Sequence, residues 1–247
     1  MYKDLQKIDH RPYPMPNNRW LMTQTWKDLL FIHWPVAKEE IEKHIPSPLQ
    51  VDTFEGKAWI AIVPFWLKSI RLHGLPRIPF ASTFFEINVR TYVTYKNRRG
   101  VYFFTLDANH LPAIKIAKAT FFLPYLHATV NLTKSGDFVN FKSIRKQHGY
   151  PKATFHANYE PTSSPFLAQR GSLEEWLIER YNLLLVNRGK VYIGEIHHKQ
   201  WELQHANVDI KTNELLSFLP SSIVKEPPLV HYSKFMRAFI WKFKQLK

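Results

Sequence analysis

The clearest hydrophobic pattern in this sequence lies in residues 84–131, where two alternating segments flank one helix. In the first segment, FFEINVRTYVTY, apolar and polar residues alternate, as in a strand that buries one face. The polar face of this strand carries Glu86, Asn88 and Arg90. A strand with an acid, an amide and a guanidinium on one face has the groups needed to bind a polar ligand.

A short helix and a second alternating strand complete this region. The run PAIKIAKATFF predicts a helix that begins at Pro112, because proline suits a first helical position, where a backbone N–H would lack a partner anyway. The next segment, YLHATVNL, alternates again and places Tyr125 and His127 on its polar face. These polar faces are either exposed to solvent or line a cavity, and the pattern alone slightly favours solvent.

The rest of the chain predicts many short strands and a few brief helices. Helices are expected at residues 35–45, 173–181 and 213–219, and hairpin turns at residues 135–137 and 187–190. Ser172 and Glu175 fit a capping box. Residues 1–18 predict a surface arm, and residues 71–81 predict a loop that could act as a lid. We therefore expect one β-rich, antiparallel α+β domain spanning residues 1–247, without βαβ alternation.

Composition narrows the class of protein. The 247 residues are 45% hydrophobic and 15% aromatic, which indicates a folded globule. There is no cysteine, so neither a disulfide nor a thiolate metal site can form. The N-terminus lacks the apolar core of a signal peptide, and the apolar run from Ala58 is about half the length that spans a bilayer. We expect a cytoplasmic protein without a membrane partner.

The formal net charge of +14 raises the question of nucleic-acid binding. The basic residues are dispersed, however, and cluster locally only at residues 96–99, 142–152 and 241–247. No zinc-finger spacing, RNP-like aromatic signature or helix-turn-helix accompanies them. Nucleic acid is therefore a disfavoured partner, whereas the sequence leaves a homo-oligomer open.

Motifs for metals and cofactors are missing from the sequence. The adjacent His197 and His198 point to opposite faces if they lie in a strand, so they do not share an ion easily. There is no HExxH arrangement, no GxSxG nucleophile elbow and no phosphate-binding glycine loop. We therefore expect neither a metal nor a cofactor.

Glu86 and Arg90 form the most informative polar pair. Four residues apart on one strand face, their α-carbons are about 13 Å apart, so both could reach into one cavity without pairing directly. A desolvated Glu86 would have a raised pKa and could exchange a proton near neutrality. Arg90 offers planar donors that suit a carboxylate or an enolate oxygen.

The segment PAIKIAKATFFLPYLHA resembles the signature of acetoacetate decarboxylases, P-A-I-x-x-G-R-E-x-x-x-x-P-K-K. Pro112 and Pro124 have the spacing of the two prolines in that signature. The segment VAKEEIEKHIPSPLQVD resembles the helix and P-x-P-L-x-x-D motif of the same family. The resemblance implies antiparallel sheets wrapped into a cone or barrel with short helices outside, and it places Glu86 at the position of a site glutamate.

A more extensive resemblance covers nearly the whole chain. RWLMTQTWKDLLFIHWPV, FFEINVRTYV, VYFFTLDA, WLIERY, IHHKQW and HYS together are similar to the YqjF-like family, a domain family of unknown function. The two decarboxylase lysines, one of which forms the Schiff base, correspond to Tyr125 and Leu126 in this sequence. Because a tyrosine cannot form an imine, the resemblance implies the fold of a decarboxylase and not its reaction.

Three functions follow from these observations. The first is an enzyme that acts on a small oxo or carboxylic compound without a Schiff base, with Glu86 and Tyr125 as catalytic residues. Asn88, Arg90 and His127 would bind its ligand. The second is a non-catalytic binder of such a molecule in the same pocket, and the third is a basic nucleic-acid-binding protein.

Overall fold

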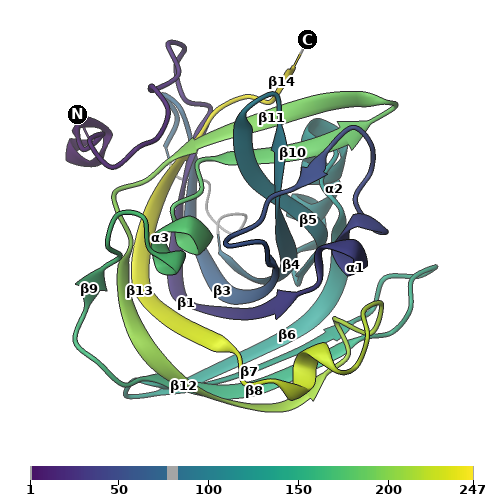
Figure 1. Ribbon diagram of the computed structural model, residues 1–247. Coiled ribbons are helices and arrows are strands. Elements are labelled where there is room, and N and C mark those ends of the chain that lie inside the picture. Colours follow the sequence, from purple (N-terminus) through teal and green to yellow (C-terminus); the bar gives the residue numbers. More distant parts are fainter. Residues whose placement is uncertain (1, 77–82, 247) are drawn as a thin grey trace.

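A closed ring of β-strands forms the body of the protein in a computed structural model that describes residues 2–76 and 83–246. The strands are β1 (Met22–Val36), β2 (Gln50–Val51), β3 (Ala58–Leu72), β4 (Phe84–Tyr95), β5 (Arg98–Ala108), β6 (Tyr125–Ser135), β7 (Phe138–Arg145), β8 (Thr154–Pro161), β9 (Phe166–Leu167), β10 (Asn182–Asn187), β11 (Lys190–His197), β12 (Glu202–Asn213), β13 (Leu229–Ile240) and β14 (Lys244–Gln245). The strands follow the order β5-β6-β7-β8-β12-β13-β1-β3-β4, and β4 pairs with β5 to close the ring (Figure 1).

Short helices complete this mostly β architecture. They are α1 (Lys38–Glu42), α2 (Leu111–Phe121) and α3 (Leu173–Ile178), with single 3-10 turns at Lys3–Gln6 and Ile223–Lys225. The predicted β-rich α+β fold is confirmed. None of the helices within the described ranges is long and apolar enough to cross a membrane.

One region departs from the expected antiparallel pairing. β5 pairs in parallel with β6, where Leu106 lies opposite Tyr125, and with β10, where Val101 lies opposite Leu183. Parallel neighbours need a crossover connection, and α2 supplies one between β5 and β6. The antiparallel pairing expected throughout is therefore wrong for β5, and the crossover brings the start of β6 next to β5.

Strand β4 is buried on both faces. Ile87 and Val89 point into a core that also contains Phe141 of β7. The opposite face contributes to a second core and carries Glu86 and Asn88, which are only 3% and 4% exposed. A solvent-exposed polar face, which the pattern alone slightly favoured, is therefore wrong for this strand. In an open sheet this polar face of β4 would be exposed to solvent, whereas the closed ring buries it.

Three of the predicted helices differ in the structure, and the one expected at residues 173–181 ends at Ile178. The helix expected at residues 35–45 is confined to α1, because Pro35 and Val36 continue β1 and pair with Trp59 and Ala58 of β3. Residues 214–219 form turns instead of a helix. At residues 35–36 the pairing of β1 with β3 outweighs the local helical periodicity.

Other local predictions agree with the structure. The turns at residues 135–137 and 187–190 join β6 to β7 and β10 to β11. Ser172 caps α3 by accepting a hydrogen bond from the backbone N–H of Glu175. Of the expected loop at residues 71–81, the first residues belong to β3, and residues 77–81 lie outside the described ranges.

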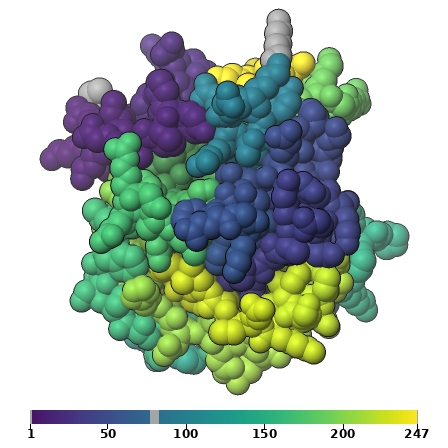
Figure 2. Space-filling model, viewed as in Figure 1, coloured from purple at the N-terminus to yellow at the C-terminus, as the bar shows by residue number. Residues whose placement is uncertain are grey.

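The N-terminal arm is docked on the ring at several points. The carbonyl oxygen of Asp4 accepts a hydrogen bond from His197 Nε2 at 2.8 Å, and its carboxylate pairs with Arg237 at 3.1 Å. Arg11 Nη1 donates to the carbonyl oxygen of Ile196 at 2.9 Å. In the space-filling view the arm (purple) lies on the surface above the green segment that includes α3 (Figure 2). The arm thus holds the end of β11 from outside.

Candidate functional site

A cavity of about 330 Å³ lies inside the ring. Its walls come from β1, β3, β4, β5, β10 and β11 and from helix α2. Most of the lining side chains are apolar, and the rings among them are those of Trp26, Phe31, Phe65, Phe84, Phe103, Phe121, Trp201 and Phe243. Ile116 of α2 also lines the cavity and is 65% exposed, so the cavity reaches the surface beside this helix.

Four polar residues singled out in the sequence meet in this interior cavity. Glu86, Asn88 and Arg90 line it from β4. Tyr125 joins them from the start of β6, because Leu106 of β5 lies between Asn88 on one side and Tyr125 on the other. The parallel pairing of β5 with β6 therefore brings two polar faces from different parts of the chain to one place.

Glu86 and Tyr125 form a buried carboxyl–phenol pair. The Tyr125 hydroxyl donates a hydrogen bond to Glu86 Oε2 at 2.8 Å. Burial raises the pKa of Glu86 to about 7, although hydrogen bonds from Tyr125 and Asn88 oppose the shift. Burial also raises the pKa of Tyr125 well above its ordinary value, so this phenol stays protonated. The Glu86 carboxyl can therefore gain or lose a proton near neutral pH.

Arg90 presents a guanidinium to the cavity without a carboxylate partner. Within residues 2–76 and 83–246, no acidic side chain lies within ion-pair distance of it. Its nearest ring contacts are Phe31 and Tyr92, whose centroids lie 5.4 and 5.9 Å from Cζ. The buried Nε has no hydrogen-bond partner, and neither has Asn88 Oδ1. Such groups are costly in a closed structure unless something else pairs with them.

His127 is not among the residues that line the interior cavity. β6 pairs with β5 only as far as His127 and pairs with β7 from Ala128 onward. The carbonyl oxygen of His127 accepts a hydrogen bond from the backbone N–H of Lys146 at 2.8 Å. Strand alternation puts His127 on the same face as Tyr125, but the strand leaves the cavity between the two residues.

Sequence reasoning missed five polar residues of the cavity: Gln24, His110, Arg180, Asn182 and His198. Arg180 is buried and pairs with Asp52 at 2.8 Å, while its Nη2 has no partner. Burial lowers the pKa of His198 to about 3, so this imidazole is neutral. The segment around Arg180 was expected to be helical, and a pairing with Asp52, far away in the sequence, leaves no local signal.

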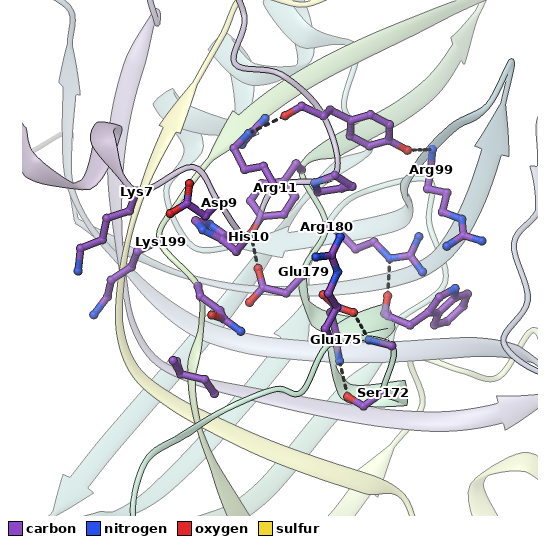
Figure 3. Close-up of a pocket in the computed structure, with 18 of the residues that line it drawn as sticks. Lys7, Asp9, His10, Arg11, Arg99, Ser172, Glu175, Glu179, Arg180 and Lys199 are labelled. Carbon is purple, nitrogen blue, oxygen red and sulfur yellow. Dashed lines mark hydrogen bonds between the residues drawn. The ribbon is translucent and has the colours of Figure 1, made fainter.

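A second hollow, the outer cleft, lies between the N-terminal arm and the ring and measures about 1040 Å³ (Figure 3). Its charged lining residues carry both signs: Lys7, Arg11, Arg99, Arg170, Arg180 and Lys199 against Asp9, Glu55, Glu175, Glu179 and Glu202. Arg180 lines both this cleft and the interior cavity. The guanidinium of Arg11 lies 4.5 Å from the ring centroid of Tyr181.

The outer cleft also contains a buried carboxyl–phenol pair. Glu179 accepts hydrogen bonds from the Tyr181 hydroxyl and, at 2.9 Å, from the backbone N–H of Trp201. Burial raises the pKa of Glu179 to about 7. Burial, reinforced by the nearby Glu179 charge, raises the pKa of Tyr181 above its ordinary value. The two hollows therefore contain the same type of pair in different surroundings.

The two adjacent histidines face different environments. His197 lies 3.1 Å from Arg11 Nη1 and also contacts Asp4, whereas His198 lines the interior cavity. In the part of the chain that the structure describes, no three side chains of the metal-binding types gather in one place.

Known structures share this fold. The chain superimposes on an acetoacetate decarboxylase from Legionella pneumophila with a TM-score of 0.62 and 13% identity, covering 98% of this chain and 94% of the other. It also matches the enduracididine biosynthesis enzyme MppR complexed with pyruvate, with a TM-score of 0.60 and 9% identity, over 93% and 91% of the two chains. At these identities the likeness shows the fold alone.

A sequence relative extends over almost the whole chain. It is the uncharacterized protein YqjF of Bacillus subtilis (strain 168), 41% identical over 240 residues, or 97% of this chain and 98% of the relative. Residues 23–237 match the model of the DUF2071 family, described as an uncharacterized conserved protein. The YqjF-like resemblance is thereby confirmed, and the chain belongs to the DUF2071 family.

Proposed function

We propose that this protein binds a small carboxylate or carbonyl compound non-covalently in the interior cavity. Arg90 anchors the acidic or carbonyl oxygen of the ligand, and Tyr125 donates a hydrogen bond to it or to Glu86. Glu86 accepts or returns a proton, so the same site supports an enzyme without a Schiff base. A purely binding role would use the same residues without turnover.

The observation that carries this proposal is the uncompensated guanidinium of Arg90. Arg90 is half-buried beside apolar side chains, with its Nε fully buried, and no protein carboxylate accompanies it among the described residues. A ligand carboxylate or enolate would supply the missing charge, in the planar geometry that a guanidinium favours.

The lining of the cavity argues against imine chemistry. No lysine is found among the described residues that line it, and Tyr125 occupies the position of the decarboxylase lysine. Lys115 and Lys118 lie on α2 but are not lining residues. The solved neighbours support the ligand class only, since one is named for acetoacetate and another holds pyruvate.

Calorimetric titration of pyruvate and acetoacetate into the wild type and the Arg90→Ala variant tests the proposal. We expect binding to the wild type and at least a tenfold loss in Arg90→Ala, with Arg19→Ala, an exposed arginine outside the cavity, as the matched control. Equal binding to wild type and Arg90→Ala would refute the anchor.

Exchange of substrate hydrogen with deuterium then separates the enzyme from the binder. If Glu86 transfers a proton, wild-type protein catalyses exchange at the carbon next to the carbonyl, and Glu86→Gln does not. Binding without exchange in the wild type would establish the non-catalytic role.

A further inference from the structure

We infer that the ligand of the interior cavity is an oxo monocarboxylate that carries an aryl-sized apolar body. This inference rests on the proposed function and narrows its ligand class. It follows from three features of the cavity: its charge, its second donor and its apolar walls.

The cavity offers one uncompensated charge and one additional donor. Arg90 lacks a carboxylate partner, whereas the charge of Arg180 is already neutralised by Asp52 at 2.8 Å. Arg180 nevertheless keeps an unpartnered, buried Nη2. The guanidinium carbons of Arg90 and Arg180 lie 5.9 and 4.7 Å from the centroid of the same ring, that of Tyr92. This arrangement fits one anionic group and one neutral acceptor, such as an oxo oxygen.

The apolar walls of the cavity favour a ligand that has an apolar part in addition to its polar group. Trp26 and Trp201 stack with ring centroids 6.0 Å apart and an interplanar angle of 14°, and Phe65 packs edge-on against Trp26 at 6.0 Å. These three rings form a rigid apolar surface of the cavity. Helix α2 contributes the small side chains of Ala113 and Ala117, which leave space beside it.

The volume of the cavity points to the same ligand size. Its 330 Å³ would hold roughly eleven water-sized groups. That is more space than pyruvate fills, so room remains for an apolar body of aryl size. A ligand with only a polar head would leave the aromatic wall in contact with water, whereas an aryl body would cover it.

The test compares pyruvate, phenylpyruvate and phenylacetone by calorimetric titration. We expect phenylpyruvate to bind roughly 10- to 100-fold more tightly than pyruvate, because its ring is buried. Phenylacetone, which lacks the carboxylate, should bind at least tenfold more weakly than phenylpyruvate, and Arg90→Ala should remove this difference.

A larger side chain on α2 would fill the apolar part of the cavity and gives a variant that tests the aryl body directly. Ala117→Phe should lower the affinity for phenylpyruvate at least tenfold more than the affinity for pyruvate. Ala113→Leu gives an independent version if the first variant does not fold, and both positions lie on a half-exposed helix that can carry larger side chains.

The outcomes distinguish this inference from the proposed function. Equal affinities for pyruvate and phenylpyruvate, both dependent on Arg90, would contradict the inference of an aryl body. The proposed function, binding of a small acidic ligand, would still stand. If neither acid binds, the proposed function fails and the inference fails with it.

Discussion

The interior cavity and the outer cleft contain the same chemical pair, and the comparison explains why we propose only the interior cavity as a ligand site. Inside the ring, Glu86 accepts a hydrogen bond from Tyr125; in the outer cleft, Glu179 accepts one from Tyr181. Burial raises the pKa of both glutamates to about 7. A raised pKa next to a phenol therefore does not by itself identify a functional site.

The guanidinium groups make the difference. In the outer cleft, Arg180 pairs with Asp52, and Arg11 donates to backbone oxygens of Tyr13 and Ile196. In the interior cavity, Arg90 has no carboxylate partner among the described residues. Arg180 is therefore neutralised by a carboxylate and Arg11 is held by backbone oxygens, whereas Arg90 has no carboxylate partner, which is why we propose it as the ligand anchor.

The largest expected effect on stability comes from removing Asp52, the carboxylate partner of Arg180. Asp52→Ala leaves the charge of Arg180 buried and uncompensated, which should lower the free energy of unfolding by about 3–5 kcal/mol. Urea denaturation measures this change. Asp9→Ala, an exposed acid of the outer cleft, should change stability by less than about 0.5 kcal/mol. A similar loss in both variants would contradict the distinction.

The pH dependence of stability tests the two carboxyl–phenol pairs. Because the folded-state pKa of Glu86 is raised to about 7, its stabilising contribution is complete below the unfolded-state pKa and is lost as pH rises through 7. Relative to Glu86→Gln, wild type should lose about 2–3 kcal/mol of stability between pH 5 and pH 8.

The same measurement on Glu179→Gln should give a change of the same sign, since the pKa of Glu179 is also raised to about 7. Urea denaturation at several pH values provides the data, and Glu55→Gln, at an exposed position, is the control. A difference between wild type and Glu86→Gln that stays constant with pH would mean that Glu86 titrates normally.

A smaller effect on stability is expected when the guanidinium of Arg90 is removed. Arg90→Met eliminates a buried Nε without a hydrogen-bond partner but also removes the interaction of Arg90 with Tyr92, so stability should change by no more than about 1 kcal/mol while ligand binding is lost. Denaturation and titration of the same sample check both halves. A loss of more than about 2 kcal/mol would show that Arg90 supports the fold instead.

No covalent change is expected from the decarboxylase-like chemistry. Borohydride reduction with acetoacetate should leave the mass of the wild-type protein unchanged, because no lysine lines the cavity among the described residues and the resemblance aligns Tyr125 with the imine-forming lysine. Tyr125→Lys is the matched variant that restores an amine at this position. Intact-mass spectrometry would detect an adduct, and a stable adduct on any wild-type lysine would overturn this prediction.

Some local structure could be predicted because it depends on short-range chemistry. The alternation in β4, the turns at residues 135–137 and 187–190, and the Ser172 cap all follow from neighbouring residues. The helix expected at residues 35–45 failed because pairing with β3 kept Pro35 and Val36 extended. Strand pairing over long sequence separations outweighed local helical periodicity there.

The sequence by itself determined the family, the β-rich fold and the candidate polar row of Glu86, Asn88 and Arg90. Only the tertiary structure decided which way that row faces, because closure of the ring buries both faces of β4. It also brought in Arg180, whose pairing with the distant Asp52 has no sequence signal. Burial and charge compensation depend on residues far apart in the chain, so they arise only when the ring is closed.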